Sequence, residues 1–198
     1  MGKGERTRAA ILDQAIDLAS VRGLEAISIG DLAGRMSLSK SGLFAHFGSK
    51  EALQRQVLEI SVERFRETVL RPALKRPRGE PRLRGLIDLW LIWNDDPERP
   101  GGCPLLAASL ELDDVPGPLR DYLADMRRQF LDSIARIVEG GITEGQFRPD
   151  LDAHQVAFEI NALIYGHVFA SRLLRDREAD RFFRAAFDRL LKDARARS

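Results

Sequence analysis

The chain has 198 residues, and its 31 basic and 30 acidic side chains leave a net charge of +1. The hydrophobic fraction of 44% excludes a disordered chain. The near-zero charge argues against a polybasic coat for nucleic acid, but not against a local DNA-binding surface. One cysteine, Cys103, and three histidines exclude a disulfide framework and leave little for a metal cluster, so we expect no metal and no cofactor.

The opening residues carry no signal-peptide pattern, and no apolar stretch reaches the roughly 20 residues that cross a bilayer. We therefore expect a cytoplasmic protein with no membrane partner. Strict alternation of apolar and polar residues is absent, and so are Asn-Gly and Asp-Gly hairpin signals. The dominant period is that of a helix, which predicts an all-α fold of about nine helices.

The first 70 residues are predicted to form four helices, at about 5–22, 29–36, 40–46 and 50–70. Gly23 lies where a helix commonly ends in a left-handed residue. Ser28, Ser39 and Ser49 each stand directly before an apolar-periodic segment, in the position of an N-cap. Ser28 is followed three residues later by Asp31, as in a capping box.

Later helices are separated by segments rich in proline and glycine. No helix is expected through 71–84, because Pro72, Pro77, Gly79 and Pro81 lie there. The remaining helices are predicted at about 83–93, 105–112, 119–144, 153–174 and 178–196. We expect two domains, residues 1–52 and residues 53–198.

The second and third predicted helices are joined by a turn of about three residues, which is the helix-turn-helix arrangement that places its later helix in the DNA major groove. No acidic residue occurs from Leu32 to Lys50, where carboxylates would repel a phosphate backbone. A second basic group, Lys3, Arg6 and Arg8, lies near the start of the chain. A solvated helical face with few acids is the alternative interpretation of this charge pattern.

The run from Leu38 to Glu51 reads Leu-Ser-Lys-Ser-Gly-Leu-Phe-Ala-His-Phe-Gly-Ser-Lys-Glu. With the residues around it, from Thr7 to Leu53, this run resembles the DNA-binding domain of the TetR family of bacterial transcriptional repressors. The matching residues are Ile11, Ala15, Leu18, Gly23, Ser28, Ile29, Leu32, Ala33, Leu38, Ser39, Leu43, Phe44, His46, Phe47, Ser49, Lys50, Glu51 and Leu53. The resemblance implies an N-terminal three-helix helix-turn-helix domain, followed by a larger helical domain for ligand binding and dimerisation.

The sequence departs from the family pattern at three positions. Ser37 stands where the family has a turn glycine, so the turn is expected to differ slightly because serine tolerates a positive φ less easily. Phe44 replaces a tyrosine and loses a hydroxyl that could reach a phosphate. Gly42 stands where threonine or alanine is common, which removes a contact to a thymine methyl group. These departures concern base preference and leave the expected fold unchanged.

The DNA-binding residues are predicted from their side-chain chemistry. Lys40 is expected to donate to guanine, with its neighbours facing base edges, whereas His46 and Lys50 are expected to bind phosphates. Ser28 and the free amides at its helix start could bind a further phosphate. The complete predicted set is Ser28, Ser39, Lys40, Ser41, Gly42, Phe44, His46 and Lys50. Since serine caps a helix in any helical protein, this prediction depends on the combination of residues.

The segment from His154 to Leu174 is apolar on nearly every side, so part of it is expected to face a second subunit. A central core helix of one bundle is the alternative. In the family that the chain resembles, the last two helices form the dimer interface, and a two-fold dimer reads a palindromic operator. The predicted interface residues are Phe158, Ala162, Tyr165, Phe169, Phe183, Phe187 and Leu190.

The resemblance also implies that a small molecule binds among the middle helices, shifts the spacing of the two DNA-binding domains and releases the repressor. Aromatic residues with a few polar groups are typical of such a pocket. The candidates are Trp90, Trp93, Cys103, Leu106, Met126, Phe130, Asn161 and Tyr165, although most would also serve as ordinary core. The effector itself is unknown from the sequence.

Two alternative functions stay open. Cys103 precedes a predicted helix, whose N-terminus lowers a thiol pKa, so a redox or electrophile sensor in the same scaffold is possible. An α-helical enzyme is the other alternative, but no catalytic signature or pair of acid and base is visible, and no enzyme is expected.

Overall fold

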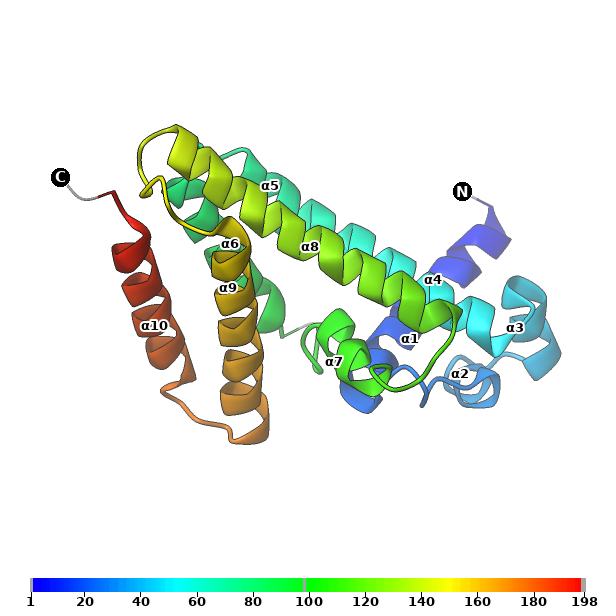
Figure 1. Cartoon of the computed structure of the whole chain (residues 1–198). Coiled ribbons are helices and arrows are strands. Elements are labelled where there is room, and N and C mark those ends of the chain that lie inside the picture. Colours follow the sequence, from blue (N-terminus) through cyan, green and yellow to red (C-terminus); the bar gives the residue numbers. More distant parts are fainter. Residues whose placement is uncertain (1, 98, 197–198) are drawn as a thin grey trace. The chain divides into compact units, whose positions relative to one another are not determined.

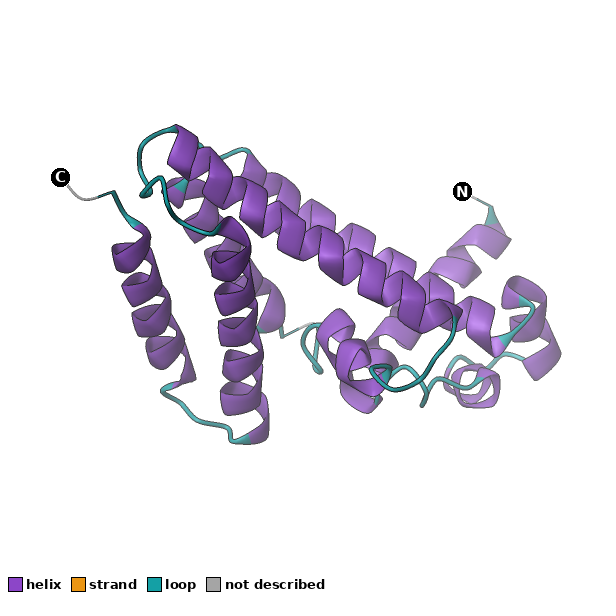
Figure 2. Cartoon of the chain, in the orientation of Figure 1, coloured by secondary structure: helices purple, strands orange, loops and turns teal. Residues whose placement is uncertain are grey.

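A computed structural model describes residues 2–97 and 99–196, apart from the side chain of Lys3 (Figure 1). Within these residues the fold is all-α, as predicted, and the only β-type pairing is an isolated bridge between Phe147 and Arg195 (Figure 2). The α-helices are α1 Lys3–Arg22, α2 Ile29–Arg35, α3 Lys40–Phe47, α4 Lys50–Phe65, α5 Arg71–Leu74, α6 Glu80–Asn94, α7 Pro104–Glu111, α8 Pro118–Thr143, α9 Ala153–Val168 and α10 Ala179–Ala194. No helix among the described residues is long and apolar enough to cross a membrane.

The chain forms two compact units that are described separately. Unit 1 comprises the residues up to Leu70 together with Leu89–Met126, and unit 2 comprises Arg71–Asp88 together with the chain from Arg127 onward. Helices α6 and α8 therefore contribute to both units. The domain boundary expected at residue 52 stays a prediction.

Local capping explains where the first helices begin and end. Helix α1 ends at Gly23, whose φ of 88° suits a residue without a Cβ atom. The side chains of Ser28, Ser39 and Ser49 each accept a hydrogen bond of 3.0 Å from a backbone N–H in the first turn of α2, α3 and α4, so the predicted N-caps are confirmed. The helices pack around fully buried Ile11, Leu32, Leu43 and Leu53.

The prediction of no helix through 71–84 was wrong at both ends of that segment. Pro81 lies in the first turn of α6, where an N–H has no partner to lose, so the helix begins at Glu80. Pro72 lies within α5, directly after a π-helical turn, Arg66–Leu70, that continues α4. A proline removes one backbone donor and crowds the preceding turn, and a locally wider helix accommodates both effects.

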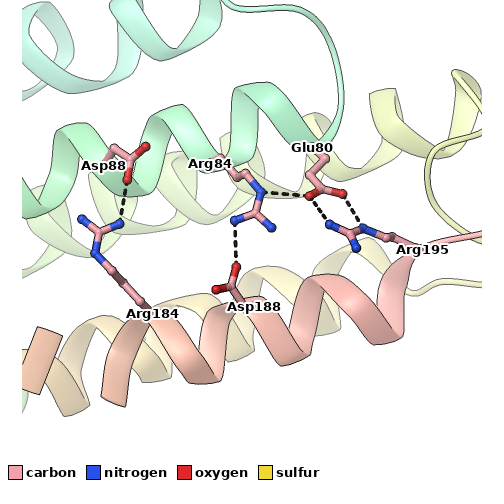
Figure 3. Close-up of polar contacts among 6 residues, drawn as sticks. All are labelled: Glu80, Arg84, Asp88, Arg184, Asp188 and Arg195. Carbon is pink, nitrogen blue, oxygen red and sulfur yellow. Dashed lines mark hydrogen bonds and ion pairs between the residues drawn. The ribbon is translucent and has the colours of Figure 1, made fainter. Parts of the chain in front are cut away.

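Helix α10 lies beside α9 in unit 2 and is joined to α6 by ion pairs (Figure 3). Three residues spaced four apart along α6 alternate between negative and positive charge. Each forms an ion pair with an oppositely charged residue on α10 or just after it. The pairs are Glu80–Arg195 (2.7 Å), Arg84–Asp188 (2.8 Å), Asp88–Arg184 (2.9 Å) and, within α6, Glu80–Arg84 (2.9 Å). Because opposite charges alternate along both sides, they match in this register, whereas a shift of one helix by one turn would bring like charges together.

Candidate DNA-binding site

The predicted helix-turn-helix is formed by α2, a short turn and α3, all within unit 1. Leu32, Leu43 and Phe47 are buried between these helices. Ser37 has φ of 54°, so the turn keeps a left-handed residue even though serine replaces glycine. The following amide, Leu38 N–H, donates to Ala33 O at 2.9 Å and closes the turn behind α2.

The start of α3 presents a polar, exposed face. Lys40, Ser41 and Gly42 are exposed in its first turn, and Phe44 is 52% exposed one turn later. The Ser39 and Ser41 hydroxyls lie 3.2 Å apart. A Cβ atom on Gly42 would stand 2.9 Å from Ser39 Oγ, so the alanine or threonine of the family pattern would press on the N-cap oxygen.

Lys40 extends across the start of α2. A Cβ atom on Gly30 would stand 3.2 Å from Lys40 Cε and 3.5 Å from its Nζ, so Gly30 leaves room for this side chain. Lys40 forms no ion pair with another described residue. Its ammonium group is therefore available to an external acceptor.

Lys50 is engaged within unit 1. Its Nζ donates to Glu25 O at 2.8 Å and to Glu25 Oε2 at 2.9 Å. The buried Gln54 amide donates to Leu24 O at 3.0 Å and to Glu25 Oε1 at 3.1 Å. Hydrogen bonds from Lys50 and then Gln54 hold the pKa of the Glu25 carboxyl below its usual range. An ammonium group has three N–H donors, so one of Lys50 is left for a phosphate.

The other predicted DNA-binding residues have local partners. Ser28 caps α2 through its hydroxyl, and His46 is half-buried with its ring 6.2 Å from that of Phe47. Arg8 was absent from the predicted set, but its guanidinium lies 5.5 Å over the ring of Phe47, the last residue of α3. The basic cluster near residue 8 was the signal in the sequence for this arrangement.

Predicted pocket residues occur in both units. In unit 1, Trp90, Trp93, Cys103 and Leu106 are buried, and half-buried Met126 lies 3.6 Å from an Arg66 nitrogen. Burial of Cys103 within unit 1 disfavours its role as an exposed redox sensor.

In unit 2, the predicted pocket residues gather around an arginine that the sequence analysis missed. Arg127 donates to Asn161 Oδ1 at 2.7 Å, and its guanidinium lies 5.3 Å from the Phe130 ring centre and 5.8 Å from that of Tyr165. Arg127 is half-buried, and no described carboxylate pairs with it. No signal in the sequence points to this cluster, because Arg127 and Asn161 are 34 positions apart and meet only in the folded chain.

The predicted interface residues divide between surface and core. Phe158 is 64% exposed and Phe169 is 54% exposed, and Ala162 and Tyr165 lie along the same side of α9 and its π-helical continuation, Phe169–Leu173. On α10, by contrast, Phe183 and Phe187 are each only 4% exposed and stack with ring centres 6.4 Å apart, while Leu190 is half-buried. The exposed aromatic residue of α10 is Phe182, which the predicted set omitted and which helical periodicity places opposite the core.

Comparison with known proteins identifies the family of the chain. The family described as "Bacterial regulatory proteins, tetR family" matches residues 11–57, and "Tetracyclin repressor-like, C-terminal domain" matches residues 79–187, over half of the chain. The chain is 28% identical over 170 residues to the HTH-type transcriptional repressor KstR2 of Mycobacterium tuberculosis, which covers 78% of this chain and 76% of that protein.

Solved structures share the fold over nearly the whole chain. A TetR transcriptional regulator from Chloroflexus aurantiacus J-10-FL has a TM-score of 0.85 and 28% identity, with 97% of this chain and 96% of that chain covered. AibR in complex with isovaleryl coenzyme A and operator DNA has a TM-score of 0.72 and 21% identity, with 92% and 95% covered.

The helix-turn-helix and its family match make the chain a DNA-binding transcriptional regulator. It belongs to the TetR family, which is a family of regulators and not of enzymes.

Proposed function

We propose that the protein is a homodimeric repressor that binds a two-fold-symmetric operator through α3 and leaves it when a small molecule binds. The observation that carries the DNA-binding part is the exposed first turn of α3, within a stretch that has no acidic residue and with a Lys40 that pairs with no described carboxylate. Asp31, the acid just before this stretch, pairs with Arg35 at 3.2 Å and so does not face DNA as an unpaired charge.

Two lysines are proposed to act differently. Lys40 at the start of α3 would read a base edge, and Lys50 would hold a phosphate. Operator sequences can be selected from a random library and measured by mobility shift. Lys50→Ala should weaken binding to all duplexes alike, whereas Lys40→Ala should also change the order of preference among duplexes. Equal losses on selected and random DNA for both variants would contradict the role of Lys40.

The dimer proposal rests on the exposed apolar stripe of α9 and α10, which includes Phe158, Phe169 and Phe182. Several large aromatic side chains exposed on two neighbouring helices are typical of an interaction surface. Analytical ultracentrifugation should give a dimer at micromolar concentration and a monomer for Phe158→Asp. Ile92→Asp is the matched control, because Ile92 is 67% exposed but lies on α6. A monomeric wild type would refute the dimer.

An effector with an anionic group fits the cluster around Arg127. The Arg127 guanidinium is held between two aromatic rings and an amide, and it lacks a carboxylate partner among the described residues. An incoming anion would therefore meet N–H donors that are already oriented. AibR, solved with isovaleryl coenzyme A, supplies a first probe. A thermal shift with isovaleryl coenzyme A or isovalerate, absent with choline and lost in Arg127→Met, supports this class. A shift that survives in Arg127→Met contradicts it.

A further inference from the structure

The loop between α1 and α2 is held by a carboxylate from α7. Glu111, the last residue of α7, accepts a hydrogen bond from Leu24 N–H at 2.6 Å and another from Glu25 N–H at 2.7 Å, one on each oxygen. These partners are 87 and 86 residues away in the chain, and both lie in unit 1. A carboxylate bound by two adjacent backbone amides is a charge-assisted, directional contact.

Gly23 completes the receptor for this carboxylate. A Cβ atom on Gly23 would stand 2.8 Å from Glu111 Oε2 and 2.9 Å from Oε1, so a side chain at this position would displace the carboxylate. The same end of α1 meets the segment before α7 at a second point: Gly101 N–H donates to Ser20 Oγ at 3.2 Å, and a Cβ atom on Gly101 would overlap the Ser20 carbonyl group. The end of α1 is thus in contact with both the segment that precedes α7 and the last residue of α7.

The opposite side of the two-residue segment Leu24–Glu25 carries the contacts to α4. Gln54 binds the Leu24 carbonyl, and Lys50 binds both the carbonyl and the carboxylate of Glu25. The position of the Lys50 ammonium group therefore depends on the position of Glu25, and the Glu25 backbone is in turn fixed by Glu111. A displacement of α7 would be transmitted through two backbone amides to a lysine at the start of α4.

We propose that Glu111 is a positioning residue for DNA binding, which acts through Leu24–Glu25 to hold Lys50 where its remaining N–H reaches a DNA phosphate. This inference rests on the proposed role of Lys50. Hydrogen bonds thus connect α7, through Glu25, to the lysine that contacts one phosphate. An effector that moves α7 would release that contact.

The electrostatic sign makes the inference testable. If Glu111 acted only as a nearby negative charge, then removing it would strengthen binding to a polyanion. Loss of its positioning role would weaken binding instead. Glu111→Asp keeps the charge but shortens the side chain by one methylene, so it separates reach from charge. Asp114→Asn, in the exposed loop after α7, is the control for removal of a charge.

Binding of the full chain to a random-sequence duplex is measured by fluorescence anisotropy as a function of salt. Loss of one phosphate contact makes the slope of log K against log salt shallower by about 0.9. The ratio of the wild-type binding constant to that of the variant should therefore fall about 3.5-fold between about 50 and 200 mM salt. Lys50→Ala should show this change. Glu111→Gln and Glu111→Asp should weaken binding and flatten the slope in the same direction, and should have no further effect in the Lys50→Ala background.

Amide hydrogen exchange at Leu24 and Glu25 gives a reading that needs no DNA, and exchange should accelerate in both Glu111 variants. Unchanged or stronger DNA binding in both variants, or losses that add fully to that of Lys50→Ala, would overturn the inference while the proposed function stands. A wild-type slope for Lys50→Ala would refute the phosphate role of Lys50 and, with it, the inference. Unaltered binding by Asp114→Asn, or slightly tighter binding, is the expected control result.

Discussion

Replacing Ser37 with glycine should stabilise unit 1, because Ser37 holds a left-handed backbone at φ of 54° in the turn between α2 and α3. That conformation costs a residue with a Cβ atom about 1–2 kcal/mol. Glycine removes the cost but adds about 0.5–1 kcal/mol of lost chain entropy on folding. The Ser37 side chain is exposed and its hydroxyl bonds to no described group, so no contact is lost. The expected net gain is about 0.5–1 kcal/mol.

Urea denaturation followed by tryptophan fluorescence measures this change directly, because Trp90 and Trp93 are the only tryptophans and both are buried in unit 1. The midpoint should rise in Ser37→Gly with an unchanged slope against urea. Ser37→Ala should match wild type, since alanine keeps the Cβ atom. Ala45→Gly, at an exposed helical position of α3, should lose about 1 kcal/mol. If Ser37→Gly is no more stable than wild type while Ala45→Gly is destabilised, then the turn stores no such strain.

Further predictions concern unit 2. Replacing two adjacent glycines of α8 with alanine should change stability in opposite directions, as measured by thermal melts followed by circular dichroism. Gly140→Ala meets open space and should stabilise the fold by about 1 kcal/mol. A Cβ atom on Gly141 would overlap the Phe147 ring, so Gly141→Ala should destabilise the fold by about 1–3 kcal/mol. Equal effects at the two positions would contradict the packing. Hydrogen bonds from Arg195 hold the pKa of Glu80 below its usual value, so Glu80 stabilises the fold above the unfolded pKa of about 4.3, and this stabilisation is lost as the pH falls through the folded pKa. Wild type should therefore be more stable than Glu80→Gln at pH 7, and this difference in stability should disappear in acid. A stability difference that does not change with pH would refute the ion pair.

The helices and the helix-turn-helix were predictable because their determinants are local. Caps at Ser28, Ser39 and Ser49, a glycine at the end of α1 and the helical period all act within a few residues. Proline was the weak point of this reasoning. Its effect depends on its place within a turn, so Pro81 starts a helix and Pro72 is accommodated behind a π-helical turn, although both suggested a loop.

The tertiary structure alone decided which side chains meet. Helical periodicity places apolar residues on a face but does not say what covers that face, so the sequence could not separate buried Phe183 and Phe187 from exposed Phe182. Contacts between distant residues, such as Arg127 with Asn161 or Glu111 with the amides after Gly23, depend on how the helices pack. Local signals in the sequence were enough to predict most of the helices and the helix-turn-helix, with the two proline-containing segments as exceptions. Packing across tens of residues decided how α7 is joined to the DNA-binding helices, because a hydrogen bond between remote groups forms only once the chain has brought them together.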